Sequence, residues 1–291
     1  MAMTVVIPSH QEAEVIGACL SSLVRQDCDD PVQVIVVANG CDDGTAAIAR
    51  RYIHAMAQHG FALEVQEIGQ ASKRVALDAG DRSARHPDRV YLDADVELSD
   101  NALSSIAAAF DAGVLFCAPQ IVPQAQTYFG RAYARVWPRL PYVAGDVIGA
   151  GMYAVSARGR ARWDCFPRIL ADDKFARLQF DRSERCVLEQ ARFSMHVPEG
   201  FRELVRVRSR WIRASRELRR EFPQLADHDR ERLAGLPRFV LANASLWRDL
   251  PPFALVYSCA MARSWLTEIG GPRSSARWER ASRARTDRQA T

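Results

Sequence analysis

Two aspartates, Asp93 and Asp95, follow a short apolar run in the segment VYLDADVEL at 90–98. Side chains alternate along a strand, so both carboxylates point to the same side. Neighbouring carboxylates repel each other, and burying them without a partner is costly. A divalent cation is the simplest partner, because Mg²⁺ and Mn²⁺ take carboxylate and phosphate oxygens. The alternative is a pair of solvated acids at a strand end, just before a helix that starts near Ser99.

The elements that must position these acids alternate between two hydrophobic periods. Apolar β-branched runs predict strands, and apolar residues at helical spacing predict helices. Strands are predicted over 4–8, 32–38, 63–68, 89–93, 114–118 and 152–156. Helices are predicted over 15–24, 44–56, 71–84, 101–112, 127–136, 172–180 and 201–219, with two more inside 236–269. Over the first 120 residues this order is typical of βαβ units and a mostly parallel sheet.

Ligands of such sheets bind beyond the carboxyl ends of the strands. Several polar or turn-forming residues lie at these ends: Pro8, Ser9, His10, Asn39, Asp93 and Asp95. We therefore expect these residues, which are far apart in the chain, to meet at one crevice.

The composition excludes several classes of protein. The chain has 291 residues, 48% of them hydrophobic and 25% charged, which is ordinary for a globular domain. It has no apolar run of 18 residues, and its first ten residues are typical of a strand rather than a signal peptide. The seven cysteines include no CxxC pair, which argues against a disulfide framework or zinc site and favours a reducing, cytoplasmic location. The net charge of +4 gives little support to nucleic-acid binding.

Short segments resemble, in order, the motifs of family 2 glycosyltransferases of the GT-A fold. They are VVIPSHQEAEVIGACLSSL with its Pro-x-x-x-Glu segment, VIVVANGCDDGTAAIAR, SKRVALDAG, DAD, GAGMYAVS, ADDKF and RSRW. The resemblance covers about residues 3–215. It implies an α/β fold of the GT-A type, a Rossmann-like and mostly parallel sheet flanked by helices. It also implies inverting transfer of a sugar from a nucleotide-sugar.

The resemblance assigns roles to the acids. Asp95, with help from Asp93, is expected to hold Mg²⁺ or Mn²⁺, which acts as a Lewis acid on the leaving diphosphate. Asp173 is expected to be the general base that takes the proton of the acceptor hydroxyl. Asp172 stands where the family has Glu. The alternative for Asp172 and Asp173 is N-capping of a helix, a common role for Asp.

Further positions follow from the same resemblance. The nucleotide pocket is expected to include Pro8, Ser9, His10, Glu12, Asn39, Lys73 and Asp93. The acceptor or diphosphate side is expected to include Gly149, Gly151, Asp172, Arg210 and Trp211. The alternatives are a solvated Lys73 at a helix start, a His10 that ends a strand, plain turns at both glycines, and a basic helix whose Trp211 lies in the core.

Two positions depart from the family pattern. Ala38 stands where the family often has Asp, so Asn39 is left to supply a contact to uracil. Val207 replaces the Gln of a Gln-x-x-Arg-Trp motif that accompanies processive synthases. This favours a non-processive enzyme that adds one sugar at a time.

The expected domains are a catalytic domain at 1–215, a helical extension at 216–270 and a basic, flexible tail at 271–291. The catalytic domain divides into a nucleotide-binding half at 1–120 and an acceptor half at 121–215. The tail contains six Arg and two acids. Residues 253–269 are apolar and predict either a core helix or an interfacial helix beside a basic tail attracted to anionic lipid. The second interpretation implies peripheral contact with the inner face of a membrane through 253–291.

The sequence thus predicts a transferase that moves a sugar, from UDP, to a hydroxyl of a glycan, a lipid-linked or a small acceptor. Such an enzyme belongs in glycan, glycolipid or polysaccharide biosynthesis. One alternative is a non-catalytic GT-A-like protein that binds a sugar or a partner. The other is a nucleotidyltransferase, which needs a Gly-rich, basic phosphate loop after the first strand. The segment PSHQEAE offers no such loop.

Overall fold

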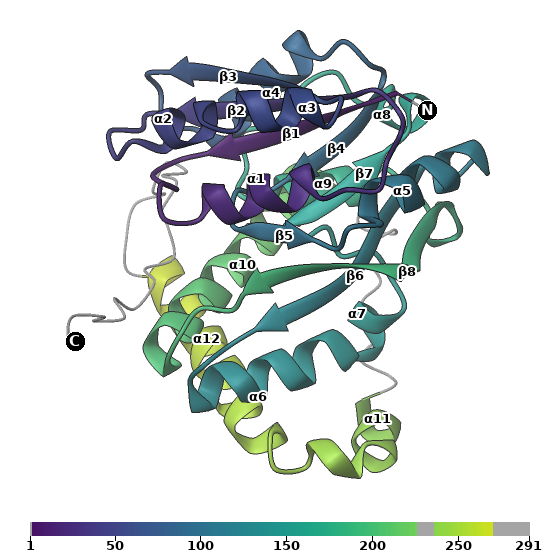
Figure 1. Cartoon of the computed structure of the whole chain (residues 1–291). Helices are drawn as coiled ribbons and strands as arrows, with labels where there is room; N and C mark the ends of the chain where they lie inside the picture. The colour runs from purple at the N-terminus through teal and green to yellow at the C-terminus, as the bar shows by residue number, and fades with distance from the viewer. Residues whose placement is uncertain (1, 226–235, 270–291) are drawn as a thin grey trace, which may run out of the picture.

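Figure 1 shows the computed structural model, which describes residues 2–225 and 236–269. Its strands are β1 (Met3–Ser9), β2 (Val32–Asn39), β3 (Ala62–Ile68), β4 (Asp88–Leu92), β5 (Val96–Leu98), β6 (Phe116–Gln124), β7 (Met152–Val155) and β8 (Arg185–His196). Its α-helices are α1 (Ile16–Val24), α2 (Thr45–Arg50), α3 (Ile53–Gln58), α4 (Lys73–Ser83), α5 (Ala102–Asp111), α6 (Tyr128–Val136), α7 (Pro141–Ala144), α8 (Ala157–Arg160), α9 (Asp172–Arg177), α10 (Phe201–Glu221), α11 (Leu236–Ala242) and α12 (Leu250–Ile269).

The strands of the described residues form one sheet in the order β3-β2-β1-β4-β7-β6-β8-β5. β1 is parallel to β2 and β4, and β2 is parallel to β3. β7 runs antiparallel to β4 and β6, β5 runs antiparallel to β8, and β6 and β8 are parallel to each other. The fold is therefore α/β with a mostly parallel sheet flanked by helices, as the sequence predicts.

Alternation along the central strands gives the sheet two covered faces. Val5 and Val34 point to one face and belong to the core that contains α1 and α5. Val6 and Ile35 point to the other face, which α4 covers. Gly80 lets α4 approach closely, because a Cβ atom there would lie 2.3 Å from a methyl carbon of Val6. Both faces of these strands are buried, which explains why their sequences are almost continuously apolar.

A separate core lies between α6, α10 and α12, below the sheet in Figure 1. Tyr133, Leu204 and Val256 contribute to it, one from each helix. α10 runs unbroken through residue 215, where the sequence predicts the end of the catalytic domain. That division stays a prediction, and the predicted tail lies outside the described residues. No helix in the described ranges is both long enough and apolar enough to cross a membrane.

The structure corrects several predicted elements. β5 and β8 are strands that the sequence pattern did not predict. β5 has only three residues, and β8, with the sequence RCVLEQARFSMH, lacks regular alternation. The predicted helix at 44–56 is wrong as one element, because a turn at Arg51–Tyr52 separates α2 from α3. The strand predicted over 114–118 extends in β6 to Gln124, past two prolines that normally interrupt a strand.

Candidate active site

The carboxyl ends of β1, β2 and β4 lie at one edge of the sheet, and the predicted site residues gather there. In Figure 1 the arrowheads of β1, β3, β6 and β8 all point to the left side of the molecule. Pro8 and Ser9 end β1, Asn39 ends β2, and the Asp93–Asp95 pair follows β4. The parallel arrangement therefore brings these segments together, although they are far apart in the chain.

Asn39 ties three of these segments to one another. Its side chain is fully buried. The amide nitrogen donates to the Ser9 carbonyl oxygen at 2.7 Å, and the amide oxygen accepts from the Ser72 backbone N–H at 3.0 Å. The Nδ1–H of His10 donates to the Asn39 carbonyl oxygen at 2.7 Å. Asn39 thus uses both ends of its amide to hold the loops after β1 and before α4.

The loop after β1 is held against the loop after β2 by side chains that the sequence pattern did not indicate. Gln11, at φ +56°, exchanges hydrogen bonds with Asp42. The Glu12 N–H donates to the Thr45 hydroxyl at 2.9 Å, and Asp43 accepts from the neighbouring Ala13 N–H at 3.0 Å. The segment GCDDGT carried a usable signal, because Asp before Gly marks a turn whose side chains bind nearby backbone.

Lys73 joins the two acidic motifs. Its Nζ atom lies 2.9 Å from Oδ1 of Asp93 and 3.3 Å from Oδ2 of Asp172. Lys73 begins α4, just after Ser72, whose hydroxyl accepts from the Val75 N–H and caps that helix. The cap fixes the first turn of α4 and therefore the direction of the lysine. Lys73 is half-buried between two acids, so its interpretation as a solvated lysine is wrong.

The two acids of α9, Asp172 and Asp173, both have raised pKa values. Burial raises the pKa of Asp172 to about 6, although Lys73 acts to lower it. Burial also raises the pKa of Asp173, again opposed by Lys73. Asp172 is buried, whereas Asp173 is partly exposed. Of the two carboxylates, Asp173 is therefore the one that a molecule entering from solvent can reach.

Neither acid of α9 is a helix cap. The N-cap position is Ala171, and it makes no side-chain cap hydrogen bond. Asp172 and Asp173 occupy the first turn, and Oδ1 of Asp173 accepts from the N–H of Lys174 at 2.7 Å. Acids in the first turn stabilise a helix through its dipole. The interpretation of Asp172 and Asp173 as N-caps is therefore wrong.

Gly149 and Gly151 carry the chain between the two acidic motifs. Both have φ +78°, a conformation that residues with a Cβ atom rarely adopt. A Cβ atom on Gly149 would lie 3.3 Å from Cβ of Asp173, and the Gly151 carbonyl accepts from the Asp93 N–H at 2.8 Å. The two glycines are therefore more than a plain turn, because they let the backbone touch both Asp93 and Asp173.

The acids after β4 fit a metal that arrives with a nucleotide. Asp93 and Asp95 are both partly exposed, and the Asp93 carboxylate also faces Lys73. Within the described residues, no group of three or more His, Cys, Asp or Glu side chains is arranged to hold a metal. Mg²⁺ is commonly bound by one or two carboxylates together with substrate phosphates and water. Two carboxylates from the protein are therefore enough ligands for such a site.

Arg210 and Trp211 lie on α10, beside the helical core. Trp211 packs against Trp137, with 5.9 Å between ring centroids, and both lie by the cluster of α6, α10 and α12. Lys174 of α9 reaches Ser215 of α10 at 3.5 Å, so α10 passes close to the acids of α9. Trp211 has a core contact, as the alternative interpretation predicts, and the contact of either residue with substrate stays a prediction.

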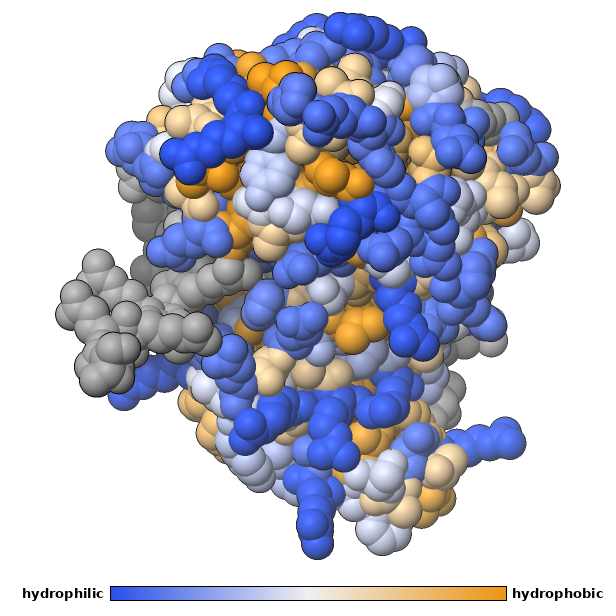
Figure 2. Space-filling model, viewed as in Figure 1, coloured by the Kyte–Doolittle hydropathy of each residue, from blue (hydrophilic) through white to orange (hydrophobic). Residues whose placement is uncertain are grey.

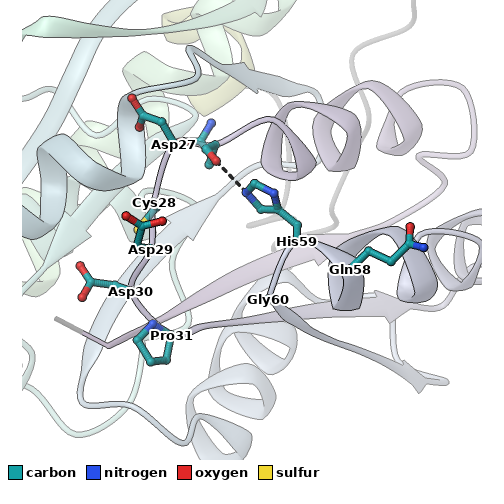
Figure 3. Close-up of a pocket in the computed structure, with 9 residues that line it drawn as sticks. Asp27, Cys28, Asp29, Asp30, Pro31, Gln58, His59 and Gly60 are labelled. Carbon is teal, nitrogen blue, oxygen red and sulfur yellow. Dashed lines mark hydrogen bonds between the residues drawn. The ribbon is translucent and has the colours of Figure 1, made fainter.

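A hollow with a volume of about 440 Å³ lies at the opposite edge of the sheet (Figure 3). It is lined by the loop before β2, at 26–31, and by the turn before β3, at 58–60. His59 lies across it and contacts the Gln26 carbonyl oxygen at 2.6 Å. These loops precede the strands rather than follow them, so this hollow is not where ligands of parallel sheets bind.

Comparison with known proteins agrees with this geometry. The model of a family described as Glycosyl transferase family 2 matches residues 4–151, just over half of the chain. The chain belongs to glycosyl transferase family 2. The match ends at Gly151, so the acids of α9 and the Arg210–Trp211 pair lie outside it. No curated protein matches the chain.

Solved structures share the fold of this family member. A mannosyltransferase, PcManGT from Pyrobaculum calidifontis, in complex with GDP-Man and Mn²⁺, is 20% identical with a TM-score of 0.58. The alignment covers 94% of this chain and 77% of that one. S. aureus TarS is 15% identical with a TM-score of 0.53, over 92% of this chain and 55% of TarS. The chain thus spans little more than half the length of TarS. TarS 1–349 in complex with UDP is 14% identical with a TM-score of 0.52, over 93% and 92% of the two chains.

Proposed function

We propose that this chain is an inverting glycosyltransferase that moves a sugar from a UDP-sugar to an acceptor hydroxyl and uses Mg²⁺ or Mn²⁺. The observation that carries the proposal is the position of Lys73 between Asp93 and Asp172. One cation links the acids after β4 to the acids of α9. A donor diphosphate bound at the first pair would therefore place its sugar beside the second pair.

The donor side is formed by the loops after β1 and β2 and by the start of α4. Pro8, Ser9, His10 and Glu12 are assigned to the nucleotide, and the buried Asn39 holds their loops in place. PcManGT was solved with GDP-Man and Mn²⁺, and TarS with UDP, so proteins of this fold accept different bases. We choose UDP, and a titration with several nucleotides tests that choice.

The metal is assigned to Asp95, with help from Asp93. When bound, Mg²⁺ or Mn²⁺ would supply positive charge to the leaving diphosphate. Lys73 supports the same end of the donor, because its ammonium lies 2.9 Å from Asp93 and carries a raised pKa. Three nearby acids, Asp172, Asp93 and Asp173, raise the pKa against the opposing effect of burial, so Lys73 stays protonated throughout the neutral range.

Asp173 is assigned as the general base. The acceptor hydroxyl gives its proton to the Asp173 carboxylate while its oxygen bonds to the anomeric carbon. The bond between that carbon and the diphosphate oxygen breaks on the opposite face, and its electron pair leaves with UDP. Inversion follows because attack and departure occur on opposite faces. The raised pKa of Asp173 makes its carboxylate a stronger base than that of an ordinary aspartate.

Asp172 is assigned to position Lys73 rather than to react. It is buried and faces the ammonium at 3.3 Å. Gly149 and Gly151 bring the backbone next to Asp173 and Asp93, where the transferred sugar would lie. Arg210 and Trp211 are assigned to the acceptor or diphosphate on α10. Val207, in place of a glutamine, favours transfer of a single sugar.

The test is release of UDP from a panel of UDP-sugars, with sugar acceptors, in the presence of Mn²⁺ or EDTA. We expect metal-dependent UDP release for one donor in the wild type and in Asp111→Ala, an exposed control on α5. We expect its loss in Asp95→Ala and Asp173→Asn. UDP binding without any turnover would favour the non-catalytic sugar-binding protein. Release of pyrophosphate from UTP and a sugar phosphate would favour the nucleotidyltransferase.

A further inference from the structure

Large apolar side chains that remain exposed gather near the end of the described residues. Ten such side chains are exposed in the ranges 2–225 and 236–269. Six of them lie between residues 240 and 266: Val240, Leu241, Trp247, Leu255, Trp265 and Leu266. The other four, Ile53, Val122, Tyr128 and Leu170, lie on four separate segments. Leu241 and Leu266 are 75% and 70% exposed, so neither is covered by the residues that the structure describes.

α12 has an apolar stripe on the side that faces away from the protein. Leu255, Ala262 and Leu266 follow one another at spacings of seven and four, which places them on one stripe of the helix. All three are exposed. On the opposite stripe, Val256 and Ala260 are buried against α6 and α10. A helix that is apolar on both sides needs a second apolar environment for its outer face.

The charges around this stripe are of one sign. Arg238, Arg248 and Arg263 are exposed. The two acids between residues 238 and 269 form ion pairs with arginines of other helices. Asp249 lies 3.3 Å from Arg135, and Glu268 lies 3.3 Å from Arg216. Exposed arginines beside apolar and tryptophan side chains match a surface of anionic headgroups over acyl chains.

The sequence that follows α12 adds charge of the same sign. Residues 270–291 contain six Arg and two acids, a balance of +4 next to the last turn of the helix. A second copy of this chain would bring arginines against arginines, which repel. An anionic lipid surface would attract both the exposed arginines and this segment.

We propose that α11, α12 and the turn between them, residues 238–266, form a docking face for an anionic lipid bilayer. Figure 1 places α11 and the start of α12 at the lower end of the molecule, and α12 then rises along the left side to the level of α10. Figure 2 shows hydrophobic residues beside hydrophilic ones at that lower end. Trp247 and Trp265, each 55% exposed, supply the amphipathic rings that lie at the headgroup level. The proposal does not depend on the proposed transfer reaction.

The test is sedimentation of the full chain with vesicles of phosphatidylcholine alone or mixed with phosphatidylglycerol. We expect binding to the mixed vesicles, weaker binding to the neutral ones, and a decrease with added salt. Absence of binding to mixed vesicles at low salt would overturn the proposal.

A pair of matched variants assigns the binding to this face. Leu241→Ser with Leu266→Ser should weaken partition into mixed vesicles by about ten-fold or more, because two apolar contacts are lost. Ile53→Ser with Val122→Ser removes exposed apolar side chains from other segments and should leave partition unchanged. Equal partition of both double variants would contradict the proposal.

Two further variants separate the docking face from the basic segment that follows it. Changing Arg238, Arg248 and Arg263 to Gln should weaken binding to mixed vesicles by about five-fold per arginine and leave neutral vesicles unaffected. Changing the six arginines of 270–291 to Gln should weaken binding without abolishing it. Complete loss in that variant would assign binding to the basic segment and overturn the docking face. A dimer that Leu241→Ser with Leu266→Ser dissociates, without a change in vesicle binding, would assign the face to a second copy.

Discussion

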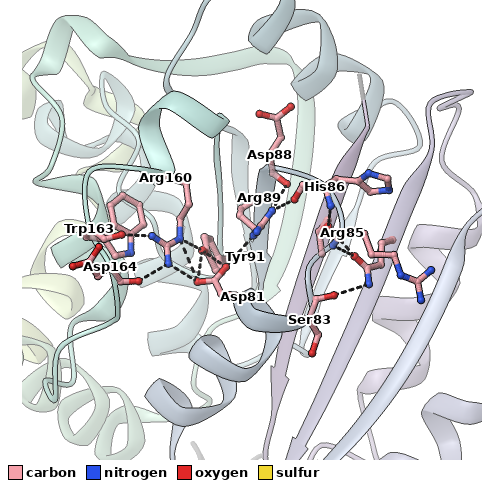
Figure 4. Close-up of polar contacts among 12 residues, drawn as sticks. Asp81, Ser83, Arg85, His86, Asp88, Arg89, Tyr91, Arg160, Trp163 and Asp164 are labelled. Carbon is pink, nitrogen blue, oxygen red and sulfur yellow. Dashed lines mark hydrogen bonds and ion pairs between the residues drawn. The ribbon is translucent and has the colours of Figure 1, made fainter.

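The two edges of the sheet hold ion clusters of opposite composition. At the amino edge, Asp81 of α4 accepts from Nε of Arg89 at 3.0 Å and from Nη2 of Arg160 at 2.9 Å (Figure 4). The Tyr91 hydroxyl also donates to Asp81, at 2.8 Å. One acid thus faces two arginines and a phenol. The three charged side chains are only 11–15% exposed, so the cluster is closed to solvent.

At the carboxyl edge the ratio is reversed, because one lysine, Lys73, faces both Asp93 and Asp172. The cluster is also more open, since the Asp93 side chain is 37% exposed. A closed cluster that joins α4, β4 and α8 braces these three elements against one another. An open cluster in which two acids face one lysine can attract a cationic or metal-bound ligand. The comparison predicts that variants of the first cluster affect stability and variants of the second affect activity.

The largest effect is expected from Asp173→Asn. Loss of the base should lower kcat by about 10²–10⁴-fold, the usual contribution of a general base. The midpoint of thermal unfolding should change little, because the asparagine keeps the size of the side chain. Steady-state UDP release and thermal unfolding on the same sample check both parts. A normal kcat in this variant would remove Asp173 from the mechanism.

The next effect concerns stability at the amino edge. Asp81→Ala leaves Arg89 and Arg160 without their acid and should lower the free energy of unfolding by about 3–5 kcal/mol, as breaking a buried pair does. Urea unfolding measures this loss, with Asp111→Ala as the exposed control. UDP affinity of the folded variant should equal that of the wild type. A variant with normal stability but weaker UDP binding would reverse the roles of the two edges.

Lys73→Met should have a pH-dependent effect. Lys73 lowers the pKa of Asp172, which burial raises to about 6, so its removal raises that pKa further. When the pKa of an acid is higher in the folded protein than in the unfolded chain, where it is about 4, the folded protein loses stability as the pH rises from the lower pKa to the higher one. The unfolding midpoint of Lys73→Met should therefore lie further below the wild type at pH 8 than at pH 5. Thermal unfolding across this range checks the sign, and an equal difference at both pH values would contradict it.

The smallest effect is expected from two glycine variants. Gly149→Ala and Gly60→Ala both place a Cβ atom at positive φ, which costs about 1–2 kcal/mol. Only at Gly149 would that atom meet Asp173, at 3.3 Å, whereas nothing lies within 4 Å at Gly60. Both variants should lose similar stability, and only Gly149→Ala should also lose kcat. Equal kcat in the two variants would show that the glycine does not position Asp173.

The sequence predicted which strand ends meet at the carboxyl edge, because β1 and β2 are buried along their whole length and end in short polar turns. Asp93, Asp95 and Lys73 could be identified from such ends and from the motif order. Strand β8 could not be predicted. It pairs with β6 through a register shift between Pro119 and Gln120, so its polar and apolar residues do not alternate regularly.

The pairing of Lys73 with Asp172 also could not be predicted from spacing. It depends on α9 lying beside the start of α4, and the residues between β7 and α9 have no regular period. The Asp81 cluster was missed for the same reason, because its members come from α4, β4 and α8. Ion pairs between elements depend on tertiary packing, which a local pattern does not contain.

The central claim is that the open carboxyl-edge cluster binds a metal-bound nucleotide. Calorimetric titration of UDP, with GDP and TDP for comparison, tests it most directly, in Mn²⁺ or in EDTA. We expect metal-dependent binding of UDP to the wild type and to Asp81→Asn, and its loss in Asp95→Ala. If no nucleotide binds the wild type with Mn²⁺, or if Asp95→Ala binds UDP as the wild type does, the claim is contradicted.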